Sequence, residues 1–283
     1  MIQPGLYIVA LPIGNARDIT LRALDTLTNV NQIFCEDTRI TRKLMTIYGI
    51  RKKLLSYHEH NAQKIRPKII DMLLSKKSIA LVCDAGTPLI NDPGFKLVSE
   101  SLAQKISVFS LPGPSAVINS LTLAGIPTDR FFFVGYPPSK SKKRKEWLKE
   151  LSGARATLVF LENPKRLLSS LIDMESVFGL RDVAVLREMT KLHEEVKRGV
   201  IKDLVNYYSF SGPPKGEITL VVGRSKKANT DIDFKLKKLL EIALKNNALK
   251  DSIGIISEAT GFSKRTVYRH ALQIKKNIRY TKN

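Results

Sequence analysis

Short apolar runs rich in β-branched residues alternate with helical patterns along the first 115 residues, and this alternation constrains the fold most. Helical segments such as DITLRALDTL and KIRPKIIDMLLSK separate four such runs: YIVAL (7–11), QIFC (32–35), IALVC (79–83) and SVFSL (107–111). Strands that alternate with helices form a parallel sheet, because each helix returns the chain to the same end of the sheet. The sequence therefore predicts an α/β domain over residues 1–115.

The pattern of apolar runs changes after residue 115, which indicates a second domain. The later runs are RFFFVGY, ATLVFLE, DVAVLRE and EITLVVG, with helical segments between some of them. They predict a second α/β domain with a mixed sheet over residues 116–225. The polar tract GRSKKANTDID (223–233) breaks the periodicity, so we expect a linker there and a small helical domain over 230–283. A length of 283 residues suits this division.

Three loops that follow strands of the first domain are rich in Gly and Pro. They are LPIGN after the first run, DAGTPLINDPG after the 79–83 run and LPGPSA after the 107–111 run. Several Gly and Pro residues together hold a backbone open, so that a ligand can approach it closely. Ligands of open parallel sheets bind beyond the carboxyl ends of the strands. The three loops together predict one ligand site, although each alone is typical of an ordinary turn.

The ligand expected at these loops carries no phosphate. The sequence lacks G-x-G-x-x-G after the first strand, G-x-x-x-x-G-K-[ST] and H-E-x-x-H, which mark dinucleotide, nucleoside triphosphate and zinc protease sites. Pro-rich loops offer few N–H donors but many carbonyl oxygens, which suit a cationic or neutral ligand with an adenine and an amino acid end. S-adenosylmethionine is such a ligand, and we expect no metal.

The net charge of +21 predicts a polyanionic partner. The chain has 47 basic and 26 acidic residues, an excess that a small metabolite does not require. Part of the excess is clustered, because the predicted loop SKSKKRKEW (139–147) holds five basic residues. Residues 226–283 hold a further 14 basic and 5 acidic residues. The alternative is a general bias toward Lys that spreads solvated charge over the whole surface.

Composition also bears on location. No apolar run approaches the roughly 18 residues that a membrane span requires, and the start MIQPGLYIVALPIGN has no basic region before its apolar run. We therefore expect a cytoplasmic protein without a membrane partner. Cys35 and Cys83 each lie in an apolar segment without CxxC spacing, which predicts buried free thiols.

Seven strings give the chain a family resemblance. LPIGN, CEDTR, HEHN, DAGTPLINDPG, PGPSA, REMTKLHEE and KGEITLVVG occur in this order. Together they resemble the bacterial ribosomal RNA small subunit methyltransferase I family, within the tetrapyrrole methylase superfamily, and the basic tail is similar to that family's small helical domain. Minor departures are Leu11, Cys83 and Met189, where Thr, Ser and Leu are commoner.

The resemblance implies a function and a cofactor site. S-adenosylmethionine would bind in a cleft between two α/β domains of a homodimer, and its methyl group would go to the ribose 2′-hydroxyl of a decoding-centre cytidine in 16S ribosomal RNA of the small subunit. The loops would supply one set of cofactor contacts: Pro12, Gly14, Asp84, Gly86, Thr87, Pro88, Ile90, Ser115 and Ala116. Later strands would close the far side near the adenine with Leu161, Glu162, Arg187, Glu188, Ile218 and Thr219.

Two polar clusters offer a base for this reaction, since a ribose hydroxyl is a poor nucleophile until its proton is drawn off. CEDTR supplies Asp37 and Arg39, and HEHN supplies His58 and Asn61. We hypothesise that Asp37 or His58 is the base and that Arg39 holds the adjoining phosphate. The alternatives are a helix cap at Asp37 and a solvated strand end at HEHN. His60 shares one side of a strand with His58, but no third metal ligand is evident.

Basic residues predict the RNA contacts. The hypothesis assigns this role to Lys140, Lys142, Lys143, Arg144, Lys145, Lys191, Lys264, Arg265 and Arg269. The last three lie in IISEATGFSKRTVYRHAL, which has helix-turn-helix spacing around Gly261. A helical hairpin that only packs on the body is the alternative.

Two further functions stay open at this point. One is a small-molecule methyltransferase of the tetrapyrrole type, which would share the loops and the cleft. The other is a DNA-binding regulator whose α/β body senses S-adenosylmethionine. A small acidic substrate explains neither SKSKKRK nor the basic tail, so the charge favours RNA.

Overall fold

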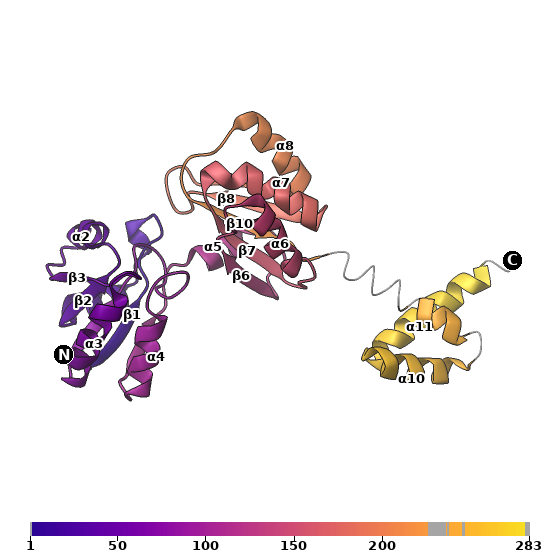
Figure 1. Ribbon diagram of the computed structural model, residues 1–283, viewed down its shortest axis with the longest axis horizontal. Helices are drawn as coiled ribbons and strands as arrows, with labels where there is room; N and C mark the ends of the chain where they lie inside the picture. Colours follow the sequence, from indigo (N-terminus) through magenta and orange to yellow (C-terminus); the bar gives the residue numbers. More distant parts are fainter. Residues whose placement is uncertain (1, 226–235, 237, 245–246, 281–283) are drawn as a thin grey trace.

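The computed structural model describes residues 2–225, 236, 238–244 and 247–280. Two α/β domains, each built on a five-stranded sheet, precede a helical C-terminal part (Figure 1). This is the fold class predicted from the sequence, which is therefore confirmed. Within the described residues, no helix is long and apolar enough to cross a membrane.

The N-terminal sheet consists of five parallel strands in the order β3-β2-β4-β1-β5. The strands are β1 (Gly5–Val9), β2 (Gln32–Cys35), β3 (Leu54–Ser56), β4 (Ser78–Leu81) and β5 (Val108–Leu111). Two apolar clusters bury the two faces under helices: α1 (Leu21–Asn29) and α2 (Thr38–Ile47) on one face, α3 (Ala62–Leu74) and α4 (Phe95–Ala103) on the other. A sheet covered on both faces needs apolar residues on both sides, which explains the continuous apolar runs in the sequence.

The second sheet is mixed, with the order β6-β7-β10-β8-β9. Only the β6–β7 pair is parallel. The strands are β6 (Phe131–Gly135), β7 (Thr157–Glu162), β8 (Asp182–Arg187), β9 (Glu195–Val200) and β10 (Ile218–Val222). One face is covered by α5 (Ala116–Ala124), and the other by α6 (Ser141–Leu151), α7 (Leu167–Phe178) and α8 (Ile201–Ser211).

Two elements of the second domain differ from the sequence prediction. The basic tract 139–147 was expected as a loop, but most of it forms α6, which buries Leu148 against the core. The strand β9 was not expected, because its sequence EVKRGV is partly polar. An edge strand has one open side and tolerates such residues.

The α5 helix brings the two domains together. It follows β5 of the first sheet, yet it packs on β7, β8, β9 and β10 of the second (Figure 1). One apolar cluster joins Val117 and Leu121 of α5 to Ile13 from the first domain and Met189 from the second. The loops of the first sheet are thereby held against the second domain.

The C-terminal part contains α10 (Leu249–Thr260) and α11 (Lys264–Tyr280), together with helical residues 238–244. Their core includes Leu240, Ile253 and Val267. Gly261 separates α10 from α11 with a φ of +71°, a backbone conformation that favours glycine and ends the helix. From residue 226 to residue 233, the tract predicted as a linker lies outside the described residues.

Candidate active site

The three Gly- and Pro-bearing loops follow β1, β4 and β5, which are neighbours in the sheet. Backbone hydrogen bonds join the first two loops, since the Leu11 N–H donates to the Gly86 carbonyl at 2.8 Å and the Gly86 N–H donates to the Leu11 carbonyl at 2.9 Å. The Thr87 hydroxyl donates to the Pro114 carbonyl at 3.1 Å and joins the third loop. The three loops thus form one connected rim at the carboxyl edge of the sheet, as the sequence predicted.

The DAGTPLINDPG loop has an unusual backbone. Four of its residues have positive φ: Gly86 (+77°), Leu89 (+76°), Asn91 (+66°) and Gly94 (+140°). Positive φ is strained for Leu and costs less for Asn, and a residue held in such a conformation costs on the order of 1–3 kcal/mol. At Gly94 a Cβ atom would lie 2.9 Å from the Leu81 side chain, so only glycine fits there. Backbone strain of this kind is typical of ligand-binding loops.

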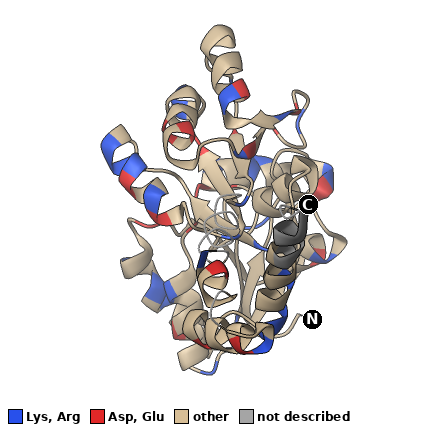
Figure 2. Cartoon of the chain, turned by 90° about the vertical axis from the view of Figure 1, so that its right-hand side faces the viewer, with Lys and Arg blue, Asp and Glu red and all other residues tan. Residues whose placement is uncertain are grey.

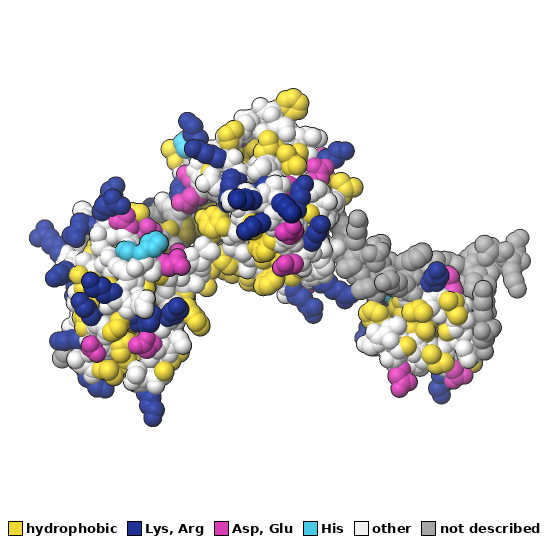
Figure 3. All heavy atoms as spheres, viewed as in Figure 1, with side chains coloured by type: hydrophobic (Ala, Val, Ile, Leu, Met, Phe, Trp, Pro, Cys, Tyr) yellow, Lys and Arg dark blue, Asp and Glu magenta, His cyan; other side chains and the backbone are white. Residues whose placement is uncertain are grey.

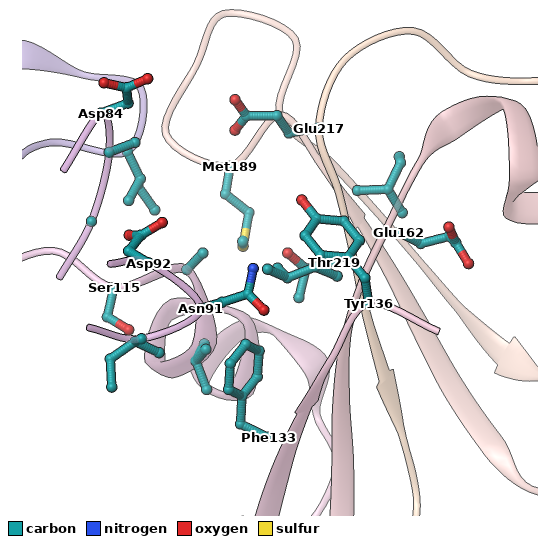
Figure 4. Close-up of a pocket in the computed structure, with 18 of the residues that line it drawn as sticks. Asp84, Asn91, Asp92, Ser115, Phe133, Tyr136, Glu162, Met189, Glu217 and Thr219 are labelled. Atoms are coloured by element: carbon teal, nitrogen blue, oxygen red, sulfur yellow. The ribbon is translucent and has the colours of Figure 1, made fainter. Parts of the chain in front are cut away.

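A cavity of about 370 Å³ lies between this rim and the second domain (Figure 4). That volume is in the range of small-molecule sites. Ten residues of the expected cofactor set line it: Asp84, Gly86, Thr87, Ile90, Ser115, Ala116, Leu161, Glu162, Ile218 and Thr219. These ten residues come from two loops of one domain and two strands of the other, and Ile13 adds the remaining loop to the lining.

Five residues of the expected set do not line the cavity. Pro12 and Pro88 are buried within the loops. Gly14 is exposed and lies against the Lys191 side chain, where an added Cβ would lie 2.5 Å from Lys191 Cγ. Arg187 pairs with Glu195 at 3.2 Å, and the Glu188 carboxylate accepts the Glu217 N–H at 2.8 Å.

Twelve lining residues were not predicted: Ile13, Ala85, Asn91, Asp92, Val117, Phe133, Tyr136, Asn163, Pro164, Met189, Gly216 and Glu217. Four of these, Ile13, Ala85, Asn91 and Asp92, lie inside the Gly- and Pro-rich loops. The loop motifs could therefore have identified them as lining residues. Phe133 and Tyr136 come from β6 and its end in the second domain. Figure 4 shows the Asn91 and Tyr136 side chains pointing into the cavity from opposite sides.

Two carboxylates give the cavity a negative wall. Burial raises the pKa of Asp84, and the nearby Asp37 carboxylate also raises it. Burial likewise raises the pKa of Asp92, with a further contribution from Asp84. Carboxylates with raised pKa values gain stability from a nearby positive charge. Apolar side chains such as Phe133, Met189 and Ile218 form the opposite wall, so the cavity suits a ligand with a cationic part and an apolar, planar part.

Glu162 lines the cavity but is already paired with the protein. Its carboxylate accepts hydrogen bonds from the Ser170 hydroxyl and, at 2.6 Å, from the Asn163 N–H. Arg166 adds an ion pair at 2.7 Å. Figure 4 shows this carboxylate directed away from the other lining groups. Glu162 therefore fixes the end of β7 through its side chain.

The arrangement of two α/β domains around a cleft matches a known family. A family model of the tetrapyrrole (corrin/porphyrin) methylases matches residues 5–205. A Mesorhizobium japonicum protein named ribosomal RNA small subunit methyltransferase I is 44% identical over 276 residues, which cover 97% of this chain and 93% of that protein. The chain belongs to this methyltransferase I family, within the tetrapyrrole methylases. The resemblance predicted from its motifs is confirmed.

Two further comparisons describe the extent of the match. A Thermotoga maritima protein with the same methyltransferase I name is 44% identical over 217 residues, which cover 97% of that protein but 77% of this chain. Uroporphyrin-III-C-methyltransferase from Thermus thermophilus superposes with a TM-score of 0.55 over 81% of this chain and 98% of that one. At 19% identity, this second likeness shows the fold alone.

In this methyltransferase I family member, the residues of the CEDTR cluster lie beside the cavity. Asp37 is the N-cap of α2, and its side chain accepts the Arg39 N–H at 2.8 Å. Hydrogen bonds from Arg39 lower the pKa of Asp37 to about 2. The Asp37 N–H donates to the Asp84 carboxylate at 3.0 Å, which places Asp37 behind that wall. A carboxylate with so low a pKa is a weak base, so these contacts favour the helix-cap alternative.

The HEHN cluster forms a tight turn after β3. The Asn61 side chain accepts the His58 N–H at 2.9 Å and donates to the Ser56 hydroxyl at 2.9 Å. Asn61 therefore holds the turn together. The Nδ1 atom of His58 is buried and has no hydrogen-bond partner among the described residues. The His58 and His60 rings lie 6.0 Å apart, and no three His, Cys, Asp or Glu side chains in the described ranges group as a metal site.

The basic residues expected to contact RNA have different environments. Lys140, Lys142 and Lys143 are exposed on and before α6, and Figure 3 shows Lys and Arg gathered on that face. Lys264, Arg265 and Arg269 are exposed on α11. Figure 2 shows further Lys and Arg on other helices, with Asp and Glu among them, so the positive charge is not confined to one element.

Two of the expected RNA contacts are engaged within the protein, and a third is partly so. Arg144 is 2% exposed and pairs with Asp173 at 2.7 Å, so it belongs to the core and not to an RNA surface. The sequence prediction was wrong at Arg144, because a run of basic residues does not show which of them lies on the buried face of a helix. Lys191 pairs with Glu188 at 2.9 Å and Glu217 at 3.2 Å, while Lys145, partly exposed, lies 3.4 Å from Asp173.

Proposed function

We propose that this chain transfers a methyl group from S-adenosylmethionine to the ribose 2′-hydroxyl of a decoding-centre cytidine in 16S ribosomal RNA. The names of the relatives support small subunit ribosomal RNA as the substrate, and the cytidine is what the family resemblance implies. The cavity between the two domains carries the proposal, because it combines a strained loop, two half-buried carboxylates and an apolar wall.

The residues of the cavity fit this methyl donor. When bound, S-adenosylmethionine supplies an electrophilic methyl group on a positively charged sulfur. Asp84 and Asp92 offer negative charge to its cationic groups, and the positive φ of Gly86 leaves the backbone open to close approach. Ile218 and Thr219 of β10 would lie against the adenine. No metal enters this arrangement.

We infer that the substrate is the RNA within the small ribosomal subunit and that the protein acts in the cytoplasm as a homodimer. The exposed lysines of α6 and the basic residues of α11 would contact RNA phosphates. A small tetrapyrrole substrate would leave this positive surface without a partner. The family name of the relatives and the basic surface both favour RNA over that alternative.

Two binding experiments distinguish the proposed function from its two alternatives. Calorimetry should show that S-adenosylmethionine binds the purified protein and that a chelator leaves this binding unchanged. Filter binding should then rank assembled small subunits and 16S RNA above duplex DNA at equal salt. Tight and sequence-dependent binding of duplex DNA would support a regulator, and the absence of any RNA preference would support a small-molecule enzyme.

Deleting residues 230–283 should weaken RNA binding without affecting binding of the methyl donor. Each lost phosphate contact lowers the slope of log affinity against log salt by about one unit. The Thermotoga maritima relative, matched over 97% of its length by 217 residues, has little sequence available for such a tail. We therefore expect the tail to add affinity and not chemistry. A truncated protein with the full salt slope would show that the tail only packs.

A further inference from the structure

A second cavity opens on the N-terminal domain, next to the cofactor cavity. It has a volume of about 660 Å³ and lies between the end of β2, the start of α3 and the start of α4. The two cavities share two lining residues, Asn91 and Asp92. Asp92 therefore forms part of the partition between them and faces a molecule in either one.

The floor and rim of the second cavity have the features of a nucleotide site. Phe95, the first residue of α4, is 72% exposed, which is unusual for a phenylalanine without a partner. Exposed aromatic rings are the platforms on which proteins stack unpaired RNA bases. Arg66 and Lys96 line the same cavity beside the carboxylates of Glu36, Glu59 and Asp92, so the cavity offers two cations for a phosphate and acidic groups for a hydroxyl. Arg66 also pairs with Glu100 at 2.6 Å, which fixes its position.

We propose that the second cavity receives the acceptor nucleotide, with its base stacked on Phe95 and its 2′-hydroxyl at the carboxylate of Asp92. This inference rests on the proposed function and adds to it the acceptor site and the group that takes the proton. In the step, the hydroxyl oxygen forms a bond to the methyl carbon. The bond from that carbon to sulfur breaks with its electron pair going to sulfur, and the hydroxyl proton goes to Asp92.

The environment of Asp92 suits this role better than that of Asp37. Burial raises the pKa of Asp92, whereas contacts with Arg39 lower the pKa of Asp37 to about 2. A carboxylate with a raised pKa is the stronger base. Burial also raises the pKa of Glu36, which lines the second cavity, and the charges of Asp84 and Asp92 raise it further. Glu36 lines only the second cavity, so Asp92 is the carboxylate placed between donor and acceptor.

Two substitutions test the two halves of this proposal separately. At saturating S-adenosylmethionine, so that any loss of donor affinity is compensated, Asp92→Asn should lower the single-turnover rate of methyl transfer to small subunits by roughly two to four orders of magnitude, the usual contribution of a general base. Its affinity for a fluorescein-labelled six-nucleotide oligocytidine, measured by anisotropy with S-adenosylhomocysteine present, should stay at the wild-type value. Asp71→Asn, at an exposed position of α3, is the matched carboxylate control and should change neither quantity.

Phe95→Ala should weaken oligocytidine binding by about 5- to 150-fold, which corresponds to the loss of one stacked base. Phe95→Trp should retain the binding, because the larger ring still offers a stacking surface. Phe210→Ala removes a phenylalanine that is 93% exposed on α8 of the second domain, and it should leave the affinity unchanged.

The outcomes separate this inference from the proposed function. If the wild-type protein methylates small subunits while Asp92→Asn does so at the wild-type rate, Asp92 is not the base. A large loss in His58→Ala together with an unimpaired Asp92→Asn would move the role to His58. Unchanged oligocytidine affinity in Phe95→Ala would overturn the stacking site. A wild-type protein that methylates no RNA would overturn the proposed function itself.

Discussion

Replacing Arg144 by Met should destabilise the protein by about 3–5 kcal/mol, the usual result of removing one partner from a buried ion pair. The Arg144 guanidinium donates to Asp173 at 2.8 Å and to the carbonyls of Pro138 and Ser139 at 3.2 Å each. Without it, the Asp173 carboxylate, of which 4% is exposed, would stay buried without its main countercharge. Urea denaturation followed by circular dichroism measures the effect.

The neighbouring Lys143→Ala is the control for this experiment. Lys143 is exposed on the same helix, so its removal should change the free energy of unfolding by less than about 0.5 kcal/mol. The double variant Arg144→Met with Asp173→Leu should regain part of the loss, because no unpaired charge remains. If Arg144→Met lost all RNA affinity and kept the wild-type stability, Arg144 would be an RNA contact and not a core residue.

Gly86→Val should reduce affinity for S-adenosylmethionine by at least about tenfold. Gly86 has a φ of +77°, a conformation that a β-branched residue does not adopt without strain of on the order of 1–3 kcal/mol. The nearest atoms to an added Cβ are 3.4 Å away, so the cost comes from the backbone angle and from obstruction of the cavity. Relief of the strain would also break the paired hydrogen bonds with Leu11. Calorimetry of the purified variant provides the measurement.

Gly49→Val separates backbone strain from a local effect at the site. Gly49 has a similar φ of +67°, has nothing within 4 Å of an added Cβ and does not line the cofactor cavity. Its variant should lose stability to a similar extent and keep its affinity for the methyl donor. Equal affinity losses in both variants would mean that strain anywhere in the N-terminal domain weakens binding, and that Gly86 has no special position.

Most of the first domain could be predicted from the sequence, because short local segments specify its strands and loops. An apolar run such as QIFC specifies a buried parallel strand wherever it lies, and its predicted bounds match β2. The Gly- and Pro-rich loops likewise predict an open turn from their own residues. The order of the strands could not be predicted from the sequence. In the structure β4, β1 and β5 are neighbours, which places the three loops side by side.

The motifs did not predict the contacts between the two domains. Ile13 was passed over in favour of Pro12 and Gly14, because Gly and Pro mark loops, whereas the ligand cavity is lined by the apolar residue between them. Phe133 and Tyr136 lie in and just after β6 of the second domain, and the packing of α5 on the second sheet brings them to the cavity. Arg144 was assigned to the surface although it is buried, because composition alone does not distinguish a buried arginine from an exposed one.

Methyl transfer onto small ribosomal subunits that lack the modification is the decisive measurement for the proposed function. The subunits are incubated with the protein and tritiated S-adenosylmethionine, and the labelled nucleotide is then mapped and digested to nucleosides. We expect one labelled position, a cytidine of the decoding centre that carries the methyl group on its ribose 2′-oxygen. A methyl group on a base, on another nucleotide or on no RNA at all would contradict it.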